Sequence, residues 1–256
     1  MDWSAAQYGK FEVERSRPAV DLLARVATEG VTSVVDLGCG PGNSTELLAD
    51  RFPLAGIVGL DLSEDMLAAA RARLPAADFR RQDIAAWQPA APVDVIFANA
   101  SLQWVPDHET LFPALLAGLA PGGTLAVQMP DNLDEPTHRL MREIAADRPW
   151  AGRMTDVAAA RAARHDPAWY YELLGGHGAH AIDVWRTTYY HPLAGAAAVV
   201  EWLKGTGLRP YLARLSPEET GDFLDRYGSA IGEAYPALAG GTVFLPFPRL
   251  FLVATR

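Results

Sequence analysis

The first half of the chain alternates between short apolar runs and stretches in which apolar residues recur at helical spacing. The apolar runs have the length and composition of buried strands, whereas the repeats at about 43–51, 63–74 and 107–119 predict amphipathic helices. Strands that alternate with helices favour a doubly wound α/β fold with a parallel sheet. The expected strands lie at about 33–38, 56–61, 78–81, 93–98 and 124–129.

Turn and capping residues mark the ends of these elements. Pro18 is expected to open a helix that Gly30 ends, because proline is tolerated in a first helical turn. Ser63 and Asp107 are good N-caps for the helices that follow them. Pro121–Gly123 predicts a turn before the fifth strand.

After residue 130 the pattern changes to alanine-rich helical segments on either side of a β-rich run. We interpret the whole chain, residues 1–256, as a single domain in which helical insertions cap the ligand edge of the sheet. Its expected parts are an N-terminal helical lid (1–30), a cofactor-binding core (31–130), helical cap insertions (131–180 and 192–242) and final strands (181–191 and 243–256).

A glycine-rich turn follows the first strand and is the candidate ligand cradle. Gly38, Gly40 and Gly42 let the backbone turn tightly and let a ligand approach closely, and the helix that follows offers unpaired N–H groups. The dinucleotide fingerprint G-x-G-x-x-G requires a third glycine where this chain has Asn43. The acidic Asp36 before the turn would repel a pyrophosphate and suits a cationic ligand.

A second acidic residue, Asp61, ends the next apolar run, about 20 residues on, where an acid binds ribose hydroxyls in such folds. A ribose near a positive charge, without a pyrophosphate, describes S-adenosylmethionine. Asp83, Asn99 and Gln128 also follow or end strands, at the edge where open α/β sheets bind ligands. These residues are therefore expected to converge on one site.

Composition limits the classes of partner. Of the 256 residues, 50% are hydrophobic and 21% charged, which is typical of a globular protein, and the net charge of -9 disfavours nucleic acid. The lone Cys39 excludes an internal disulfide and a cysteine metal cluster, and is expected to be a small apolar filler. Without a signal-peptide pattern or a membrane-length apolar run, we expect a cytoplasmic protein with no membrane partner. Whether it is a monomer or a dimer stays open.

The motifs resemble those of class I S-adenosylmethionine-dependent methyltransferases, namely Val35–Gly42, Gly59–Ser63, Gln82–Ile84 and Pro121–Gly123. Further segments are similar to the trans-aconitate 2-methyltransferase family, so the resemblance spans nearly the whole chain. It implies a Rossmann-like fold with a mostly parallel seven-stranded sheet and helical cap insertions after strands five and six. These further segments are Glu14–Pro18, Phe97–Trp104, Ala126–Asn132, Glu135–His138, Trp185–His191, Thr206–Pro210 and Phe247–Phe251.

The resemblance also implies a cofactor site for S-adenosylmethionine, whose product is S-adenosylhomocysteine. Asp61 would bind both ribose hydroxyls, Asp83 the adenine amino group, and Asp36 the methionine amino group directly or through water. An Asp after a short strand is also a common turn cap, which is the alternative for Asp83. The full expected set is Asp36, Gly38, Cys39, Gly40, Asn43, Asp61, Leu62, Met66, Gln82, Asp83, Ile84, Asn99, Ala100 and Trp104.

The implied substrate, trans-aconitate, is a small tricarboxylate that becomes a monomethyl ester. Arginine binds carboxylate through two parallel hydrogen bonds, and the candidates are Arg15, Arg17, Arg186, Arg209 and Arg249, each of which has a surface ion pair as its alternative. Further hydrogen bonds or pocket walls are expected from Tyr8, Trp104, Gln128, Asn132, His138, Tyr189 and Tyr190, whose aromatic members have core packing as their alternative.

A carboxylate nucleophile is already ionised near neutral pH. We therefore predict catalysis by positioning alone, with no catalytic triad, general base or metal. Three alternatives remain: a methyltransferase of another small polycarboxylate, a non-catalytic S-adenosylmethionine-binding protein, and a nicotinamide dehydrogenase. Asn43 and Asp36 both argue against the dehydrogenase.

Overall fold

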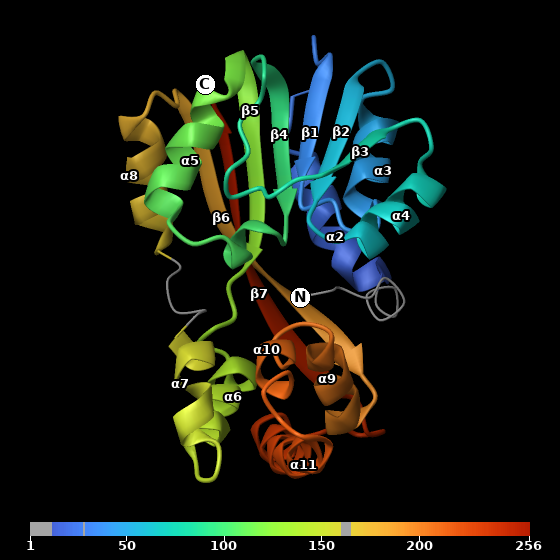
Figure 1. Ribbon diagram of the computed structural model, residues 1–256, viewed down its shortest axis with the longest axis vertical. Coiled ribbons are helices and arrows are strands. Elements are labelled where there is room, and N and C mark those ends of the chain that lie inside the picture. The colour runs from blue at the N-terminus through green and yellow to red at the C-terminus, as the bar shows by residue number, and fades with distance from the viewer. Residues whose placement is uncertain (1–11, 28, 160–164) are drawn as a thin grey trace. The chain divides into compact units, whose positions relative to one another are not determined.

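The computed structural model describes residues 12–27, 29–159 and 165–256 (Figure 1). Tyr8 and the side chain of Arg15 lie outside the described part, as do residues 1–11 and 28 of the predicted lid (1–30). Among the described residues, no helix is both long and apolar enough to cross a membrane.

The described residues divide into two compact units. The sheet unit contains those up to Pro130 together with His165–Thr187 and Leu250–Arg256. The helical unit contains those of Asp131–Arg164 and Thr188–Arg249.

A seven-stranded sheet is built in the order β3-β2-β1-β4-β5-β7-β6. The pairs β1–β2, β2–β3, β1–β4 and β4–β5 are parallel, as predicted. The last strands form an antiparallel hairpin, so the sheet is mixed, which agrees with the expected mostly parallel sheet and departs from a purely parallel one at this hairpin. The connection of an antiparallel pair begins and ends at the same edge of the sheet, and here residues 194–242 form that connection between the neighbouring strands β6 and β7. The bounds are β1 Ser33–Leu37, β2 Gly56–Asp61, β3 Asp78–Arg81, β4 Val93–Asn99, β5 Leu119–Pro130, β6 Ala181–Leu193 and β7 Val243–Thr255.

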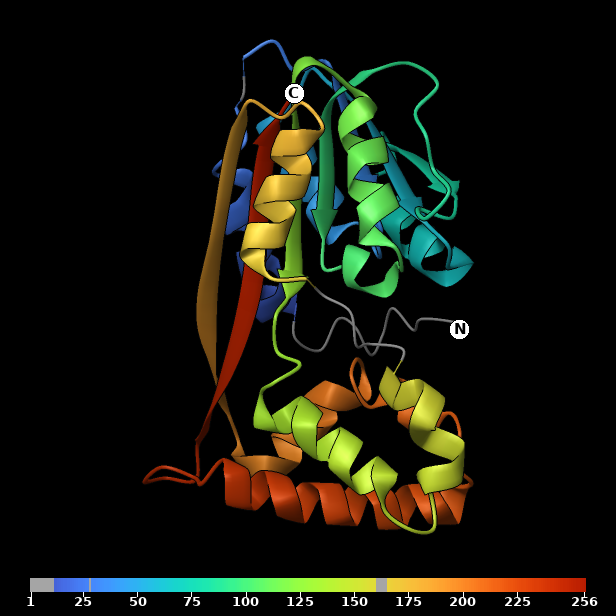
Figure 2. The same ribbon diagram turned by 90° about the vertical axis from the view of Figure 1, so that its left-hand side faces the viewer.

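Helices cover this sheet and give its unit a large apolar core. Leu37, Ile96 and Leu125 from the strands pack with Phe112 and Tyr170 from α5 and α8, which lie on the same face of the sheet (Figure 2). The helices of the sheet unit are α2 Glu12–Leu23, α3 Asn43–Arg51, α4 Glu64–Arg73, the 3-10 helix η2 Leu102–Trp104, α5 His108–Ala117 and α8 Pro167–Gly176.

The boundary of the first predicted cap insertion differs in the structure. The prediction placed α8 in the 131–180 insertion, but α8 belongs to the sheet unit. Tyr170 explains this, because its ring centroid lies 5.0 Å from that of Phe112 and its hydroxyl lies 2.5 Å from Nδ1 of His108. Both partners belong to α5, so burial of one tyrosine ties α8 to the sheet.

Two local predictions, those for Pro18 and for Pro121–Gly123, were wrong. Pro18 does not open a helix but lies inside α2, where its side chain is buried. Pro121–Gly123 is not a turn before a strand but part of β5, which begins at Leu119. There Gly122 has φ +81°, and its N–H donates to the carbonyl of Arg256 at 2.7 Å. In β5, pairing with the distant end of the chain overrides the local turn preference.

The helical unit has its own core around α11. Trp150 and Phe223 pack edge to face at 5.2 Å, and Tyr227 is fully buried and donates to the carbonyl of Thr137 at 2.9 Å. Helix α11 packs against α6 and α9 (Figure 2) and begins with a capping box formed by Ser216 and Glu219. The helices are α6 Pro136–Ala146, α7 Ala151–Ala159, α9 Gly195–Lys204, α10 Arg209–Leu212 and α11 Pro217–Ala234.

Candidate functional site

The carboxyl edge of the parallel strands brings together most of the predicted cofactor residues, as expected from the strand order. Gly40 N–H donates to Oδ2 of Asp61 at 3.0 Å, which joins the turn after β1 to the end of β2. Gln82 N–H donates to the Asp61 carbonyl at 3.1 Å, and Ala100 N–H donates to the Gln128 carbonyl at 2.9 Å. The ends of β1 to β5 are thus linked by short contacts.

The first two glycines of the turn after β1 are explained by different physical reasons. Gly38 has φ +73°, and an added Cβ would lie only 2.4 Å from Cβ of Ser101. Gly40 has φ +54°, and an added Cβ would meet nothing within 4 Å. Gly38 is therefore required by a neighbouring segment of the protein, whereas Gly40 borders open space of the kind a ligand needs.

Asp36 lies beneath this turn and is completely buried. Its Oδ2 accepts hydrogen bonds from the hydroxyls of Ser44 and Thr45, each at 2.7 Å, while Oδ1 has no partner. Burial is the largest cause that raises the pKa of Asp36 to about 6; the two hydroxyls lower it and nearby Asp61 raises it further. A buried carboxyl with one open oxygen favours a cationic partner.

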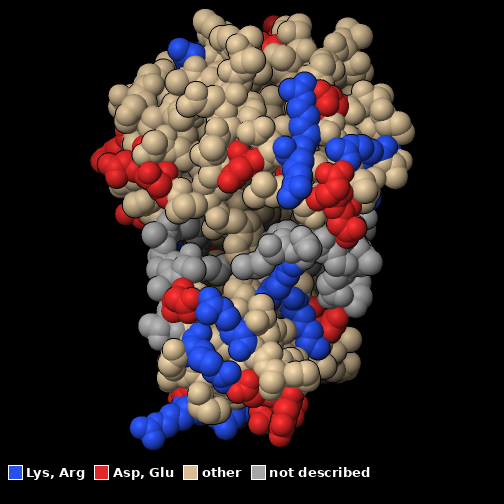
Figure 3. Space-filling view, viewed as in Figure 1, with Lys and Arg blue, Asp and Glu red and all other residues tan. Residues whose placement is uncertain are grey.

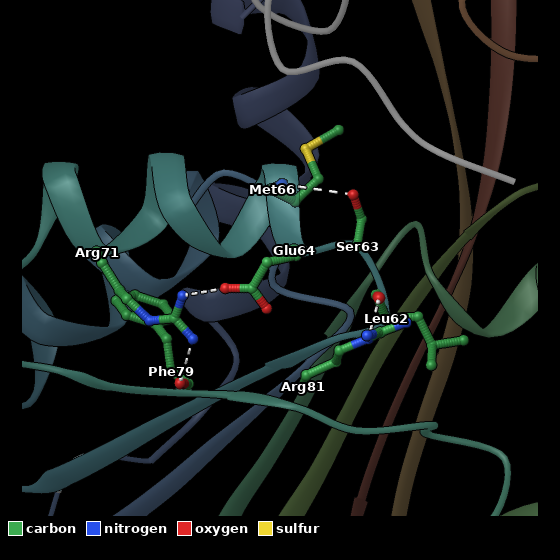
Figure 4. A network of polar contacts seen from close by, with 7 residues as sticks. All are labelled: Leu62, Ser63, Glu64, Met66, Arg71, Phe79 and Arg81. Carbon is green, nitrogen blue, oxygen red and sulfur yellow. Dashed lines mark hydrogen bonds and ion pairs between the residues drawn. The ribbon is translucent and has the colours of Figure 1, made fainter.

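Backbone contacts hold Asp61 at the start of the loop after β2. Arginine side chains bind backbone carbonyls in and near this loop (Figure 4). Oδ1 of Asp61 accepts from Ser63 N–H at 2.8 Å. Arg81 on β3 donates through Nε to the carbonyl of Leu62 at 3.1 Å, and Arg71 on α4 donates to the carbonyl of Phe79 at 3.1 Å. Sequence analysis missed these arginines, because an exposed arginine carries no local sign of the distant carbonyl it will bind.

The other predicted residues of this loop and of α4 differ in exposure. Leu62 is 56% exposed, whereas Met66 is buried and donates its N–H to Oγ of Ser63 at 3.4 Å. Ser63 is thus the N-cap of α4, as predicted. Cys39 is buried in a small cluster with Leu67, so the prediction of an apolar filler is confirmed.

The segment after β3 fits its alternative interpretation in part. Asp83 is exposed, and its Oδ1 accepts from the N–H of Ala85 at 2.9 Å, as in a turn cap. Ile84 is half-buried against the main core, while Gln82 is exposed. An adenine contact for Asp83 stays a prediction.

The segment after β4 carries backbone strain beside the glycine turn. Ala100 has φ +54°, which is uncommon for a residue other than glycine and is often found at functional sites. Its carbonyl accepts from Nε2 of Gln103 at 2.6 Å, and the next residue, Ser101, donates through Oγ to the carbonyl of Leu37 at 2.6 Å. Trp104, at the end of η2, is 38% exposed. Gln103 and Ser101 lie at this candidate site, and sequence analysis did not identify them, although both lie inside a segment that it did.

Unpartnered buried oxygens reveal which ligand chemistry this edge accepts. Among the residues that the structure describes, four side-chain oxygens at this edge are buried without a hydrogen-bond partner, and because such oxygens accept, a ligand that satisfies them must donate. An amino group and ribose hydroxyls supply such donors, and the residues present therefore fit S-adenosylmethionine. The atoms are Oδ1 of Asp36, Oδ1 of Asn43, Oδ1 of Asn99 and Oε1 of Gln103.

The described substrate candidates are divided between the two units. Arg17 and Arg186 are exposed in the sheet unit, and Gln128 is fully buried there. Arg209 is half-buried in the helical unit, where Arg249 is only 4% exposed and lies over the ring of Phe247 at 4.8 Å. Convergence of these arginines on one pocket stays a prediction.

Apart from Trp104 in the sheet unit, the remaining described candidates belong to the helical unit. Asn132, His138 and Tyr189 are buried, and Nδ1 of His138 lies 3.1 Å from the hydroxyl of Thr137. Tyr190 is 57% exposed and stacks on Phe244 with a centroid distance of 5.9 Å. The structure therefore shows Tyr190 in a packing contact, which was the alternative interpretation. A ligand contact for Tyr190 stays a prediction.

Charges are mixed on the surface of the described residues. Figure 3 shows acidic and basic side chains interspersed on one face, so basic groups there are accompanied by acidic ones.

Comparison with known proteins identifies close relatives over the full length. A family model described as a methyltransferase domain matches residues 34–123. The chain is 56% identical over 255 residues to a trans-aconitate 2-methyltransferase of Methylobacterium nodulans, covering 100% of this chain and 98% of that protein. It is 55% identical over 256 residues to the protein of that name from Rhizobium meliloti, covering 100% and 99%.

Solved structures share the fold at low identity. One is phosphoethanolamine N-methyltransferase 2 of Haemonchus contortus in complex with S-adenosyl-L-methionine, with a TM-score of 0.56 and 18% identity over 94% of this chain and 52% of that one. Another is geranyl diphosphate C-methyltransferase of Streptomyces coelicolor, with a TM-score of 0.54 and 15% identity over 98% and 82%. At these identities the likeness concerns the fold alone.

Proposed function

The chain belongs to the trans-aconitate 2-methyltransferase family, and on this premise we propose that it transfers a methyl group from S-adenosylmethionine to one carboxylate of trans-aconitate. The products are the monomethyl ester and S-adenosylhomocysteine. The observation that carries this proposal is identity above 50% along the entire chain, which includes the helical unit as well as the cofactor motifs.

The sheet unit holds the cofactor in this proposal. Asp61 binds the ribose hydroxyls while keeping its hydrogen bonds from Gly40 and Ser63. Asp36 and Asn99 accept from the methionine amino group, which supplies the donors that their buried oxygens lack. The charge on Asp36 also matches that amino group, because a nearby cation favours the ionised carboxyl.

The chemistry asks little of acid or base groups. When bound, S-adenosylmethionine supplies an electrophilic methyl group on a positively charged sulfonium. The carboxylate nucleophile is ionised at neutral pH, since carboxyl pKa values lie near 4. The protein's task is therefore to hold the nucleophile in line with the methyl group and to exclude water, which can lower the barrier by about 7 kcal/mol or more.

The substrate is held by cationic and hydrogen-bonding side chains in this proposal. Arg249 is the strongest candidate, because an arginine that is 4% exposed keeps its charge in a place where charge is costly. Arg209, His138 and Asn132 are further candidates of the helical unit. A protein of net charge -9 needs such local positive groups to bind a trianion.

A methyltransferase of another small polycarboxylate is the second candidate, because the cofactor residues are the same in both. A radiolabelled methyl-transfer assay separates them, with trans-aconitate, cis-aconitate, citrate and isocitrate as acceptors. Base-labile label on trans-aconitate is the expected result. Label on citrate or isocitrate alone would assign that compound as the substrate in place of trans-aconitate. Label on none of the four, with S-adenosylhomocysteine still bound, would refute the substrate assignment.

A further inference from the structure

Ser101 joins the two loops that border the candidate cofactor site. Its side chain is 7% exposed, and its hydroxyl donates to the carbonyl of Leu37, the last residue of β1, at 2.6 Å. The β1–β4 register ends one residue earlier, at Asp36 and Phe97. The hydroxyl of Ser101 thus continues the connection between the two strands beyond the end of their ladder.

Steric fit reinforces this bond. An ideal Cβ on Gly38 would lie 2.4 Å from Cβ of Ser101, closer than real Cβ contacts come, and a tight 3.1 Å from its Oγ. The absence of a side chain at Gly38 therefore admits Ser101. One residue supplies the side chain and the other supplies the space for it.

The backbone on both sides of Ser101 is held as well. Ala100 adopts φ +54°, with its N–H bonded to the carbonyl of Gln128 and its own carbonyl bonded to Gln103. Trp104 N–H donates to the Ser101 carbonyl at 3.1 Å. Strain at a residue other than glycine persists only where its surroundings enforce it, and Ser101 is part of those surroundings.

We propose that Ser101 is a positioning residue of the cofactor site, which sets the distance between the Gly38 turn and the Asn99–Ala100 segment. This inference rests on the proposed function, because it assumes that both loops contact the same cofactor. Among the described residues, two buried oxygens without partners lie on the two strands that this junction joins, Oδ1 of Asp36 on β1 and Oδ1 of Asn99 on β4. A ligand that donates to both requires them at a fixed separation, which is what the link from Ser101 to Leu37 provides.

Single variants test the hydroxyl. Ser101→Ala keeps Cβ and removes the hydrogen bond, and we expect its Kd for S-adenosylhomocysteine, by calorimetry, to rise about fivefold to tenfold. Ser33→Ala is the matched control. It removes a serine hydroxyl that donates to Asp94 at 2.9 Å and joins the same two strands at their opposite end. It should lower the melting temperature similarly and leave the Kd unchanged.

A double-mutant cycle tests the steric pairing. We expect Gly38→Ala to weaken S-adenosylhomocysteine binding by about 30-fold or more through the clash with Ser101. Adding Ser101→Gly removes the clashing Cβ, and the double variant should regain at least about tenfold over Gly38→Ala, since contacting residues are coupled. All affinities are measured at a temperature where circular dichroism shows each variant folded.

Two outcomes would overturn the proposal. One is a wild-type Kd in Ser101→Ala. The other is a double variant whose loss of affinity equals the product of the losses measured in Gly38→Ala and in Ser101→Gly separately. Both outcomes are measured by cofactor binding alone, so they can be distinguished from a failure of the proposed function. That failure would be a wild-type protein that binds S-adenosylhomocysteine normally and methylates no trans-aconitate.

Discussion

The sheet unit and the helical unit bury opposite charges at their candidate ligand residues. In the sheet unit the buried charged group is the carboxyl of Asp36, and the unpartnered buried oxygens around it are acceptors. In the helical unit it is the guanidinium of Arg249, accompanied by the buried imidazole of His138. A sulfonium cofactor with an amino group fits the first chemistry, and a tricarboxylate fits the second. In the proposed function, Asp36 therefore serves the cofactor and Arg249 serves the substrate.

Asp61→Ala is expected to have the largest effect and to separate the two units most clearly. It removes the proposed ribose contact and both hydrogen bonds that hold the loop. We expect the Kd for S-adenosylhomocysteine to rise about 100-fold, the equivalent of losing two charge-assisted hydrogen bonds. Isothermal calorimetry measures it, and a wild-type Kd would refute the role of Asp61.

Arg249→Ala tests the helical unit in the same way. We expect kcat/KM for trans-aconitate to fall about 30-fold while cofactor affinity stays unchanged, because a charged hydrogen bond to the acceptor is lost. Arg226→Ala is the matched control, since Arg226 lies over the ring of Trp150 at 5.0 Å in the same unit and is not a substrate candidate. Equal losses in the two variants would mean that Arg249 only packs.

A smaller effect is expected from pH, acting on the sheet unit through Asp36. Its pKa of about 6 means that the carboxyl takes up a proton as the pH falls from 7 to 5 and loses its attraction for a cation. We expect the Kd for S-adenosylhomocysteine to rise about tenfold over that range. Asp36→Asn should bind weakly with no such dependence, and a flat profile in the wild type would contradict the assignment.

The same group predicts the pH dependence of stability. Because the pKa of Asp36 in the folded protein lies above the ordinary value of 3.8, this contribution to stability is complete below about pH 4 and is lost as the pH rises through 6. The loss at neutral pH is on the order of 3 kcal/mol. Chemical denaturation at pH 4.5 and 7 should therefore show a smaller decline in Asp36→Asn than in the wild type, and identical declines would refute the linkage.

The smallest expected effect compares two helix caps. Ser63 Oγ accepts from Met66 N–H at 3.4 Å in the sheet unit, and Ser216 Oγ accepts from Glu219 N–H at 3.3 Å in the helical unit. Replacing either serine by alanine should cost about 1 kcal/mol of unfolding free energy. Only Ser63→Ala should also raise the cofactor Kd, about twofold to threefold, since loss of the cap loosens the start of α4, and the backbone N–H of Ser63 there donates to Asp61. An equal change of Kd in both variants would remove the distinction between the units.

Sequence analysis succeeded where a feature is local. The strands β1 to β4, the cap at Ser63 and the apolar role of Cys39 follow from patterns within a few residues, and the structure confirms them. The candidate cofactor site was accessible for the same reason, because its residues end consecutive strands of one sheet. The substrate candidates come from segments far apart in the chain, and their spacing in the sequence does not show whether their side chains lie close together.

The chain's own residues therefore determined the order of strands and helices, the glycine turn and the acidic residues at the strand ends. Periodicity and capping are set by neighbouring residues, so they can be recognised without a structure. Contacts between distant residues were decided by packing. The fit of Ser101 against Gly38, the bond from Arg81 to Leu62 and the docking of α8 through Tyr170 each join segments well separated in sequence. Such contacts depend on three-dimensional shape and on burial, which no local pattern encodes.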